Sequence, residues 1–498
     1  MKRTEEFDKR EMFACGGPVR GNIVEADYKH SEDPMFRDNP FIEALPPIMS
    51  PEEFAEVARW HPTYEEGENK KDMHYRIMAS KRILTLVEPL PPFLRFYYCL
   101  MGQLCFGYHA RNLKWSGYLR QLQGSFQGKQ FSNDPYRRPV LQNAESGSCV
   151  LGISGTGKST LVKTVLGLIP QVIRHGEYKG EQFIQQQLVY VFVSCFAGRT
   201  LKELVYQFLF QVEQLLDYPC YSRCINKNKS EASLLFEMAK IAWTSRLGAL
   251  VIDEVQNLQF RETRTGEKQK RVTDSPKLLK TLVTFSNIFE IPIVFIGTPD
   301  AEPLIGKSMP LSRRATQSSR IDVKRLEKGK QFKAFLEILW KYNFLKKVEK
   351  LTPEIITAFY KESQGIVGVL VSLYMFVQWE AIYSGAEKIS VDLIQNVAKS
   401  HFGPLNPWLG LIKKGREKCF STPELLFPEL SYESFLANKE SSKEEDADEN
   451  GQDPDEGSKA SSQPKTLTAG KDARRKKKTK SEKNYQSLID RGLIEEKE

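Results

Sequence analysis

The sequence lacks any apolar run that could span a bilayer. Its longest apolar stretch, PFLRFYYCLMGQLCFGYH, is interrupted by Arg95 and by polar and glycine positions, whereas a transmembrane helix needs about 20 predominantly apolar residues. The first residues, MKRTEEFDKREMF, mix acidic with basic residues and have no apolar core, so we do not expect a secretory signal. These absences favour a cytoplasmic protein that has no membrane partner.

Cysteine is also sparse, with 8 in 498 residues. The closest pair, Cys220 and Cys224, has no histidine near it, and the spacings show no framework. We therefore expect reduced thiols, with neither a disulfide scaffold nor a cysteine-based metal site. An internal repeat is absent as well.

What the chain does contain is typical of a soluble globular protein of two or three domains: 40% of its residues are hydrophobic and 27% are charged. The net charge is +9, and an acidic stretch near residues 440–456 conceals a larger basic excess elsewhere. Such an excess is compatible with a nucleic-acid partner, although many basic proteins bind none.

The order of patterns predicts four regions. An N-terminal extension, expected to serve assembly and docking, covers residues 1–135, and an α/β core covers residues 136–345. The core has apolar β-rich runs separated by helical stretches: SCVLGI, QLVYVFVSC, GALVIDE and IPIVFIGT. This alternation predicts a parallel sheet covered on both faces. Residues 346–415 are expected to be helical, and residues 416–498 form a polar tail whose charge blocks, such as KDARRKKKTK, predict disorder.

The stretch GISGTGKS matches the phosphate-binding pattern G-x-x-x-x-G-K-[ST] and lies between an expected strand and an expected helix. Glycines allow the backbone to wrap phosphates closely, and the amides at the helix N-terminus hold the anion. Lys158 should reach the β and γ phosphates of ATP, and Ser159 should ligate Mg²⁺. The expected nucleotide-binding residues are Gly152, Ser154, Gly155, Thr156, Gly157, Lys158, Ser159 and Thr160.

Two carboxylates close the apolar run GALVIDE. Asp253 is expected to hold the magnesium ion through water, and Glu254 is expected to act as the general base on the attacking water. An acidic pair at a strand end is common by itself, but its presence in a chain that also has a phosphate loop favours a role in ATP hydrolysis. Glu254 also favours hydrolysis, because metal binding needs only the first carboxylate.

Further candidates follow the strand that ends at Gly297. Thr298 is either a sensor of the γ phosphate or a strand-end turn residue. Arg313 and Arg314 are candidates for an arginine finger that acts on a neighbouring subunit's nucleotide, with Arg320 in reserve, although surface arginine pairs are frequent.

In this order of motifs the chain resembles AAA+ ATPases over about residues 136–415. Several segments also resemble the TnsC family of ATPases that regulate Tn-seven-like transposons: FRDNPFIEALPP, GYHARNLKWSGYLRQLQ, LLKTLVTFSNIFEIPIVFIGTP and SQGIVGVLVSLYMFVQ. The resemblance implies an ATP-dependent homo-oligomer, a ring or a filament, on double-stranded target DNA. It also implies a target-selector protein as one partner and transposase and endonuclease subunits as others.

The resemblance gives a role to the basic segment that follows the carboxylate pair. In a ring or spiral of such ATPases this segment faces the central channel, where Arg264, Lys268 and Arg271 would contact DNA phosphates, together with Arg199 and Lys202. The alternative is a solvated loop. No aromatic residues are interleaved, so backbone contact without base reading is expected. One departure from AAA+ lids is Gly368, which stands where many lids carry an arginine.

The resemblance also suggests docking peptides at both ends, Phe36–Pro47 for the target selector and residues 484–498 for the transposase machinery. The C-terminal peptide has the alternative of folding back on the lid. Two other functions are compatible with the nucleotide motifs: a replication initiator or helicase loader, and a signalling NTPase scaffold with little hydrolysis. The first would carry a helix-turn-helix domain after residue 415, where the sequence has none, and Glu254 argues against the second.

Overall fold

The computed structural model describes residues 23–111, 147–195, 201–216, 218–225, 230–259, 282, 291–306, 312–313, 316, 318–347 and 349–414. The chain divides into two units, Met1–Glu429 and Leu430–Glu498, and every described residue lies in the first. Within the described ranges, no helix combines the length and the apolar character needed to cross a membrane.

The strands are β1 (Ile23–Glu25), β2 (Gly147–Leu151), β3 (Val172–Tyr178), β4 (Glu181–Leu188), β5 (Tyr190–Ser194), β6 (Ala249–Asp253), β7 (Ile293–Gly297) and β8 (Ser319–Asp322). The α-helices are α2 (Pro40–Glu43), α3 (Pro51–Ala58), α4 (Met73–Ser80), α5 (Pro91–Ala110), α7 (Lys158–Gly167), α8 (Leu201–Leu216), α9 (Cys220–Ile225), α10 (Glu231–Thr244), α12 (Glu302–Ile305), α14 (Lys330–Trp340), α15 (Pro353–Ser363), α16 (Val367–Tyr383), α17 (Val391–His401) and α18 (Asn406–Lys413). The 3₁₀ helices are η1 (Glu68–Lys70), η2 (Lys81–Thr85), η3 (Val255–Gln259), η4 (Pro299–Ala301) and η5 (Gly403–Leu405).

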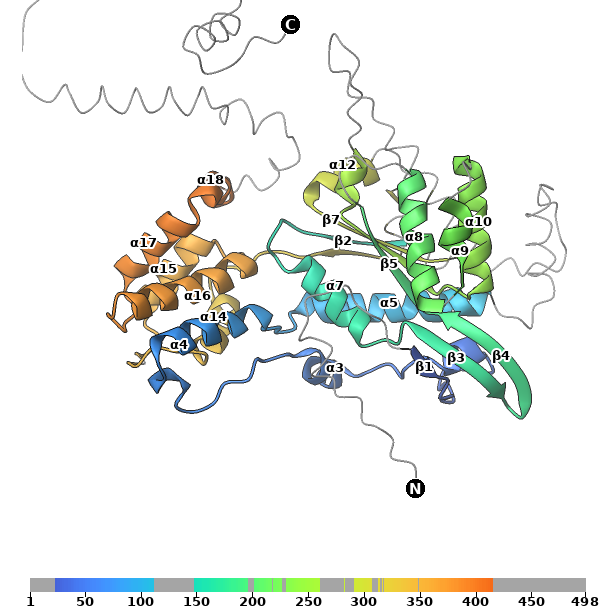
Figure 1. The fold of residues 1–498 in the computed structure, drawn as a ribbon, viewed down its shortest axis with the longest axis horizontal. Coiled ribbons are helices and arrows are strands. Elements are labelled where there is room, and N and C mark those ends of the chain that lie inside the picture. The colour runs from blue at the N-terminus through green and yellow to red at the C-terminus, as the bar shows by residue number, and fades with distance from the viewer. Residues whose placement is uncertain are drawn as a thin grey trace, which may run out of the picture. The chain divides into compact units, whose positions relative to one another are not determined.

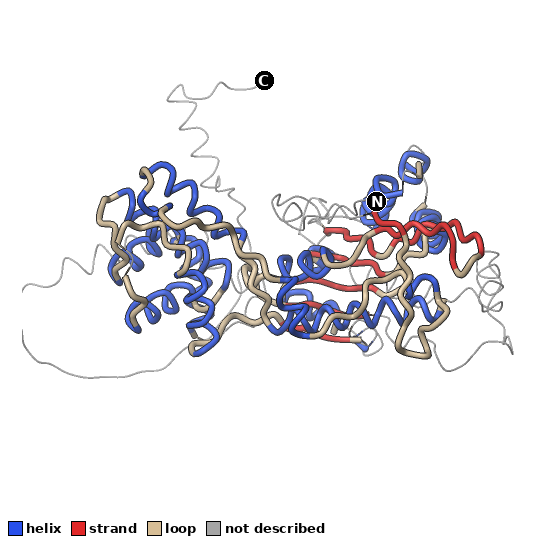
Figure 2. Tube along the Cα trace, turned by 90° about the horizontal axis from the view of Figure 1, so that it is seen from below, coloured by secondary structure: helices blue, strands red, loops and turns tan. Residues whose placement is uncertain are grey.

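The central sheet has five strands in the order β5-β6-β7-β2-β8, and every pair in it is parallel. Figure 2 shows the strands of the structure in red. This confirms the expected parallel sheet. The edge strand β8 was not expected, because its four residues, SRID, carry little apolar signal. It adds to β2, the strand that leads into the phosphate loop.

Helices cover both faces of this sheet, as the apolar strands require. Alternate residues of a strand point to opposite faces, and β6 follows the rule. Leu250 and Ile252 join a hydrophobic cluster with α8 and α10, whereas Ala249 and Val251 join a second cluster with α5 and α7. Figure 1 shows these two pairs of helices on opposite sides of the sheet.

The apolar run QLVYVFVSC contributes to two strands. The structure divides the segment into β4 and β5, because the backbone changes its partner at Val189, whose N–H donates to Gln171 O. Strand β4 forms an antiparallel hairpin with β3, and both turn residues, Lys179 (φ 55°) and Gly180 (φ 84°), are left-handed. Such a two-residue turn matches the twist of a hairpin.

The apolar side chains in the middle of the segment Phe36–Pro47 are buried, whereas Arg37 and Pro47 are exposed, and docking of a target selector by this segment stays a prediction. Phe41 is 2% exposed and Leu45 is 4% exposed, both in the cluster that contains α5. Asn39 caps α2 with its side-chain oxygen and donates from Nδ2 to Tyr108 O at 3.1 Å. Burial and capping together make the segment part of the core.

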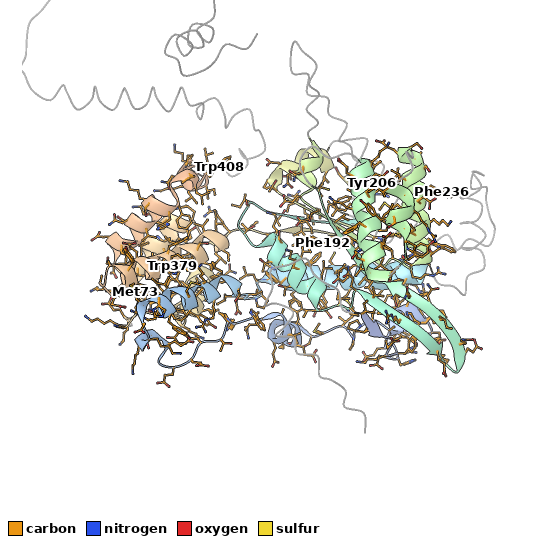
Figure 3. The ribbon with its side chains drawn as sticks, viewed as in Figure 1. Met73, Phe192, Tyr206, Phe236, Trp379 and Trp408 are labelled. Carbon is orange, nitrogen blue, oxygen red and sulfur yellow. The ribbon has the colours of Figure 1, made fainter. Side chains whose placement is uncertain are left out.

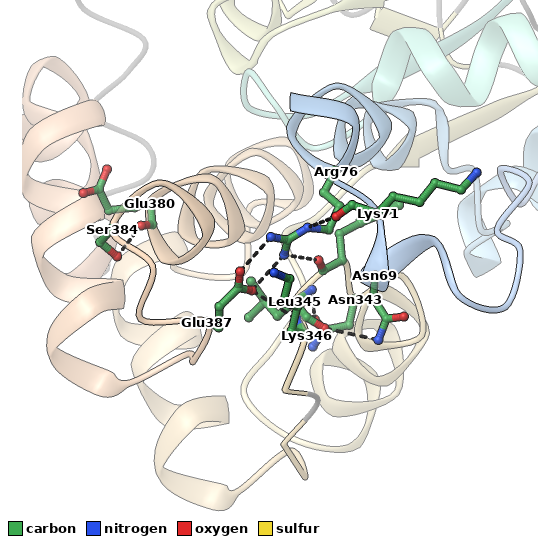
Figure 4. A network of polar contacts seen from close by, with 10 residues as sticks. Asn69, Lys71, Arg76, Asn343, Leu345, Lys346, Glu380, Ser384 and Glu387 are labelled. Atoms are coloured by element: carbon green, nitrogen blue, oxygen red, sulfur yellow. Dashed lines mark hydrogen bonds and ion pairs between the residues drawn. The ribbon is translucent and has the colours of Figure 1, made fainter. Parts of the chain in front are cut away.

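The helical lid is built from α14 to α17, and α15 begins at the expected cap, Thr352. Its hydrophobic cluster already includes α14, so a boundary at residue 345 cuts through it. Helix α4 and η2 from the N-terminal segment belong to the same cluster. A buried ion pair joins the two, with Arg76 donating to both oxygens of Glu387 at 2.7 and 2.8 Å (Figure 4).

Candidate nucleotide site

The phosphate loop connects β2 to α7, which is the strand–loop–helix context that its motif requires. Gly155 (φ 84°) and Gly157 (φ 92°) are left-handed, a conformation that favours glycine. A Cβ atom on Gly152 would lie 2.5 Å from Val323 O, so no other residue fits there. Thr156 is buried and closes the loop by donating from Oγ1 to Ile153 O at 2.8 Å. The loop is thus held in shape by its own residues.

Lys158 is the first residue of α7 and is only 9% exposed. Its Nζ donates to Ile153 O at 3.1 Å, within the loop. Burial lowers the pKa of Lys158, and the negative charges of Glu254 and Asp253 oppose this shift. The lysine and the two carboxylates therefore share one electrostatic site, although about a hundred residues separate them. Ser159 is half-buried beside it, and Thr160 is exposed.

Asp253 ends β6 and is 7% exposed. Its Oδ1 accepts a hydrogen bond from Glu254 N at 2.8 Å. Burial raises the pKa of Asp253, because a carboxylate loses hydration inside the protein, while this hydrogen bond and the charge of Lys158 oppose the rise. A bound cation would offset the free energy that is lost when the negative carboxylate of Asp253 is buried.

Glu254 is half-buried and has a φ of 57°. Left-handed backbone is uncommon for a residue other than glycine, and such strain gathers at functional sites. It directs the chain into η3 immediately after the strand.

Thr298 follows β7 at the same edge of the sheet and lies half-buried. Its N–H donates to Gln256 Oε1 at 3.1 Å, and its hydroxyl donates to Asp300 Oδ2 at 3.3 Å. Gln256 in turn donates from Nε2 to Glu254 Oε2. Gln256 and Asp300 were both missed by the sequence reasoning; the available signal was a polar side chain two residues beyond each strand-end site residue.

The lid contacts the phosphate loop directly. Gly368 N, near the start of α16, donates to Gly155 O at 2.8 Å, and a Cβ on Gly368 would lie 3.1 Å from that oxygen. A cavity of about 540 Å³ lies beside this contact, between Ser154 and Gly155 of the loop, the residues after β7, and α16 and α18. Phe402 and Trp408 are among its lining residues. Figure 3 labels Trp408, which lies on α18.

The arginine and DNA candidates are only partly described. Arg313 is exposed, and Arg314 lies outside the described residues. Arg320 lies on β8 and forms ion pairs with Glu302 at 2.8 Å and Asp322 at 3.0 Å, so its guanidinium is already engaged. Lys202 is half-buried on the first turn of α8. Arg199, Arg264, Lys268 and Arg271 lie outside the described residues, as does the tail from residue 415.

The residues present fit a magnesium ion. Mg²⁺ prefers oxygen ligands and in nucleotide sites uses one or two protein groups together with phosphates and water. The hydroxyl of Ser159 and the buried carboxylate of Asp253 are donors of this kind.

Comparison with known proteins agrees with this architecture. Residues 142–305 match a family profile described as AAA domain. No curated protein matches the chain. The family match, together with the parallel sheet, identifies an AAA+ fold with a P-loop nucleotide site.

Among solved structures, the ORC1 protein of Aeropyrum pernix in complex with DNA is similar at 14% identity and a TM-score of 0.33, covering 57% of this chain and 65% of that one. Drosophila ORC bound to DNA is similar at 13% identity and a TM-score of 0.36, covering 73% and 72%. AMPPCP-bound DnaA from Aquifex aeolicus is similar at 14% identity and a TM-score of 0.27, covering 48% and 57%. The chain thus spans less than two thirds of the Aeropyrum and Aquifex chains, and the fold assignment rests on the family match.

Proposed function

We propose that this AAA+ chain is an ATPase that assembles on duplex DNA and regulates DNA transposition in the manner of TnsC. The observation that carries the ATPase part is the phosphate loop between β2 and α7, with Lys158 buried at the start of α7 and Asp253 and Glu254 at the end of β6 acting on its charge. The transposition part rests on the four segments that resemble the TnsC family.

In the proposed reaction, water attacks the γ phosphorus of ATP, and the bond to the oxygen that bridges the β and γ phosphates breaks. Glu254 accepts the proton from the water, and Lys158 offsets the negative charge on the phosphates. A magnesium ion held by Ser159 and Asp253 would further neutralise phosphate charge. Thr298 is proposed to sense the γ phosphate or to orient the attacking water, and Arg313 or Arg314 to act on a neighbouring subunit's nucleotide.

The proposed partners follow from the resemblance. Arg199, Lys202, Arg264, Lys268 and Arg271 are proposed to contact DNA phosphates in an assembled ring or filament. The C-terminal residues 484–498 are proposed to dock on the transposase machinery. The proposed domain limits are those given by the sequence, except that α14 belongs with the lid.

The test is the rate of ATP hydrolysis with and without duplex DNA, followed by electron microscopy with an ATP analogue. A transposition regulator should hydrolyse faster on DNA of any sequence and form rings or filaments around it. A strong preference for one DNA sequence would instead favour the replication-initiator function. ATP binding without measurable turnover under all conditions would favour a nucleotide-held scaffold.

A further inference from the structure

Gln256 connects Glu254 to the end of strand β7. Its side-chain amide lies on η3 and makes two hydrogen bonds of opposite direction. Nε2 donates to Glu254 Oε2, and Oε1 accepts from Thr298 N at 3.1 Å. These partners fix the orientation of the amide, because only its nitrogen can donate and only its oxygen can accept.

The end of β7 leaves space for this amide. Gly297 is the last residue of the strand, and a Cβ atom on it would lie 2.9 Å from Gln256 Oε1 and 3.1 Å from Ala301 Cβ. A larger residue at position 297 would therefore displace the Gln256 side chain. Glycine is therefore required at position 297 by the close packing of Gln256, and not by a left-handed backbone.

The same strand end touches the phosphate loop. Gly297 O accepts a hydrogen bond from Gly152 N, the first glycine of the loop, at 3.2 Å. A continuous set of hydrogen bonds thus runs from the loop through the end of β7 to Gln256, and from Gln256 to Glu254. A shift of the loop or of the strand end would reach Glu254 through these bonds.

We propose that Gln256 is a positioning residue that holds the carboxylate of Glu254 in its working orientation and couples that orientation to the end of β7. The inference rests on the proposed ATP hydrolysis. A glutamate side chain has several rotatable bonds, and a base that is misplaced by about 1 Å can lose up to about 100-fold in rate. One oxygen of Glu254 is held by Gln256, which leaves the other oxygen to accept the proton of water.

Two substitutions separate positioning from a purely structural role. Gln256→Met has a similar length and loses both hydrogen bonds. Gln256→Glu keeps an acceptor for Thr298 N but loses the donor and places a second carboxylate against Glu254. If the bond to Thr298 were the important one, Gln256→Glu would retain activity.

The matched control is Asn257→Ala. Asn257 lies next to Gln256 on η3, and its Nδ2 donates to Cys195 O at 2.8 Å rather than to the Glu254 carboxylate. This substitution removes a side-chain hydrogen bond from the same 3₁₀ helix without touching the base. Thermal unfolding of all the variants, followed by circular dichroism, verifies that they are folded.

The measurements are single-turnover hydrolysis and the Kd of a fluorescent ATP analogue. We expect both Gln256 substitutions to lower the hydrolysis rate about 10- to 100-fold with the Kd unchanged, and Asn257→Ala to hydrolyse at the unmodified rate. Combined with Glu254→Gln, Gln256→Met should cause no further loss, because residues that act as a unit are not additive.

Three results would overturn the inference, and they are distinguishable. Hydrolysis at the unmodified rate by Gln256→Met, or by Gln256→Glu, overturns the inference alone. A large rise in Kd in both Gln256 variants assigns the residue to the shape of the phosphate loop instead. An unmodified chain that binds ATP but does not hydrolyse it overturns the proposed function and this inference together.

Discussion

Lys158 and Glu254 occupy one site but have different tasks at the scale of single residues. Lys158 is buried at the start of α7, and its charge faces both carboxylates. Glu254 lies half-buried at the strand end, beside Gln256. In the proposed reaction the lysine supplies phosphate binding, whereas the glutamate supplies the base.

Substitution of each residue should separate these tasks. Lys158→Ala should abolish ATP binding, because it removes the positive partner of the phosphates. Glu254→Gln should bind ATP as the unmodified chain does and lose about 100- to 10,000-fold in turnover, the usual range for a general base. Equilibrium binding of a fluorescent ATP analogue and phosphate release measure the two effects. Turnover by Glu254→Gln at the unmodified rate would show that Glu254 is not the base.

At the scale of elements, two left-handed glycines lie in the connections before and after helix α16 of the lid. Gly365 has a φ of 75°, and a Cβ on it would lie 1.9 Å from Leu326 O. Gly385, after α16, has a nearly identical φ of 72°, but a Cβ there would meet no atom within 4 Å. The two positions therefore share the backbone strain and differ in the steric collision.

Alanine at these two positions should give unequal losses of stability. Gly385→Ala should cost about 1 to 2 kcal/mol, the usual penalty of left-handed backbone for an L-residue. Gly365→Ala should cost clearly more, because the new methyl group also displaces the segment around Leu326. Urea unfolding monitored by circular dichroism gives both values. Equal losses would mean that the Leu326 segment moves aside freely.

The ion pair between Arg76 and Glu387 gives a second prediction at this scale. Arg76 is 2% exposed, and it also donates to Phe344 O at 3.0 Å and to Lys71 O at 3.0 Å (Figure 4). Glu387→Gln should lower the free energy of unfolding by about 3 to 5 kcal/mol, because it leaves a buried guanidinium without its counter-charge. Glu337→Gln, in the exposed pair with Lys333, is the control and should change it by less than about 1 kcal/mol.

The pH dependence of this effect has a definite sign. Burial alone would raise the pKa of Glu387, but hydrogen bonds from Arg76 and from the backbone of Lys346, with the positive charges beside it, lower it overall. A lowered folded-state pKa means that the stabilisation is fully present above the unfolded value of about 4.3 and is lost as pH falls through the folded value. The difference in stability between the unmodified chain and Glu387→Gln should therefore shrink below about pH 4. A difference that grows on acidification would contradict this assignment.

At the scale of the whole molecule, the proposed DNA interface should be governed by phosphate contacts. Substitution of Arg264, Lys268 and Arg271 by alanine should weaken binding to every duplex sequence. It should also lower the slope of log affinity against log salt by about one unit for each lost contact. Fluorescence anisotropy over a series of salt concentrations measures the slope.

The control for charge alone is an equal change elsewhere on the chain. Lys328, Lys330 and Lys333 are exposed near the start of α14 on the lid, and their substitution by alanine removes the same net charge. This variant should keep the slope of the unmodified chain. If the two triple variants lose the same slope, the effect belongs to net charge and not to the basic segment after the carboxylate pair.

The sequence by itself determined the features that depend on short-range pattern. The phosphate loop is recognisable because its glycines, lysine and serine are close together in the sequence and contact one another locally. Asp253 and Glu254 are recognisable because they are polar residues that directly follow an apolar strand. The same patterns predicted the parallel sheet, since apolar strands alternating with helices have few other ways to bury both faces.

Only the tertiary structure decided which distant groups meet. The amide of Gln256 bridges two strand ends that lie more than forty residues apart, and its sequence neighbours carry no trace of that partner. The short strand β8, the contact of Gly368 with Gly155, and the burial of Phe41 depend in the same way on packing between elements. Hydrogen bonds and close packing are directional and short in range, so their partners are fixed only when the chain brings the elements together.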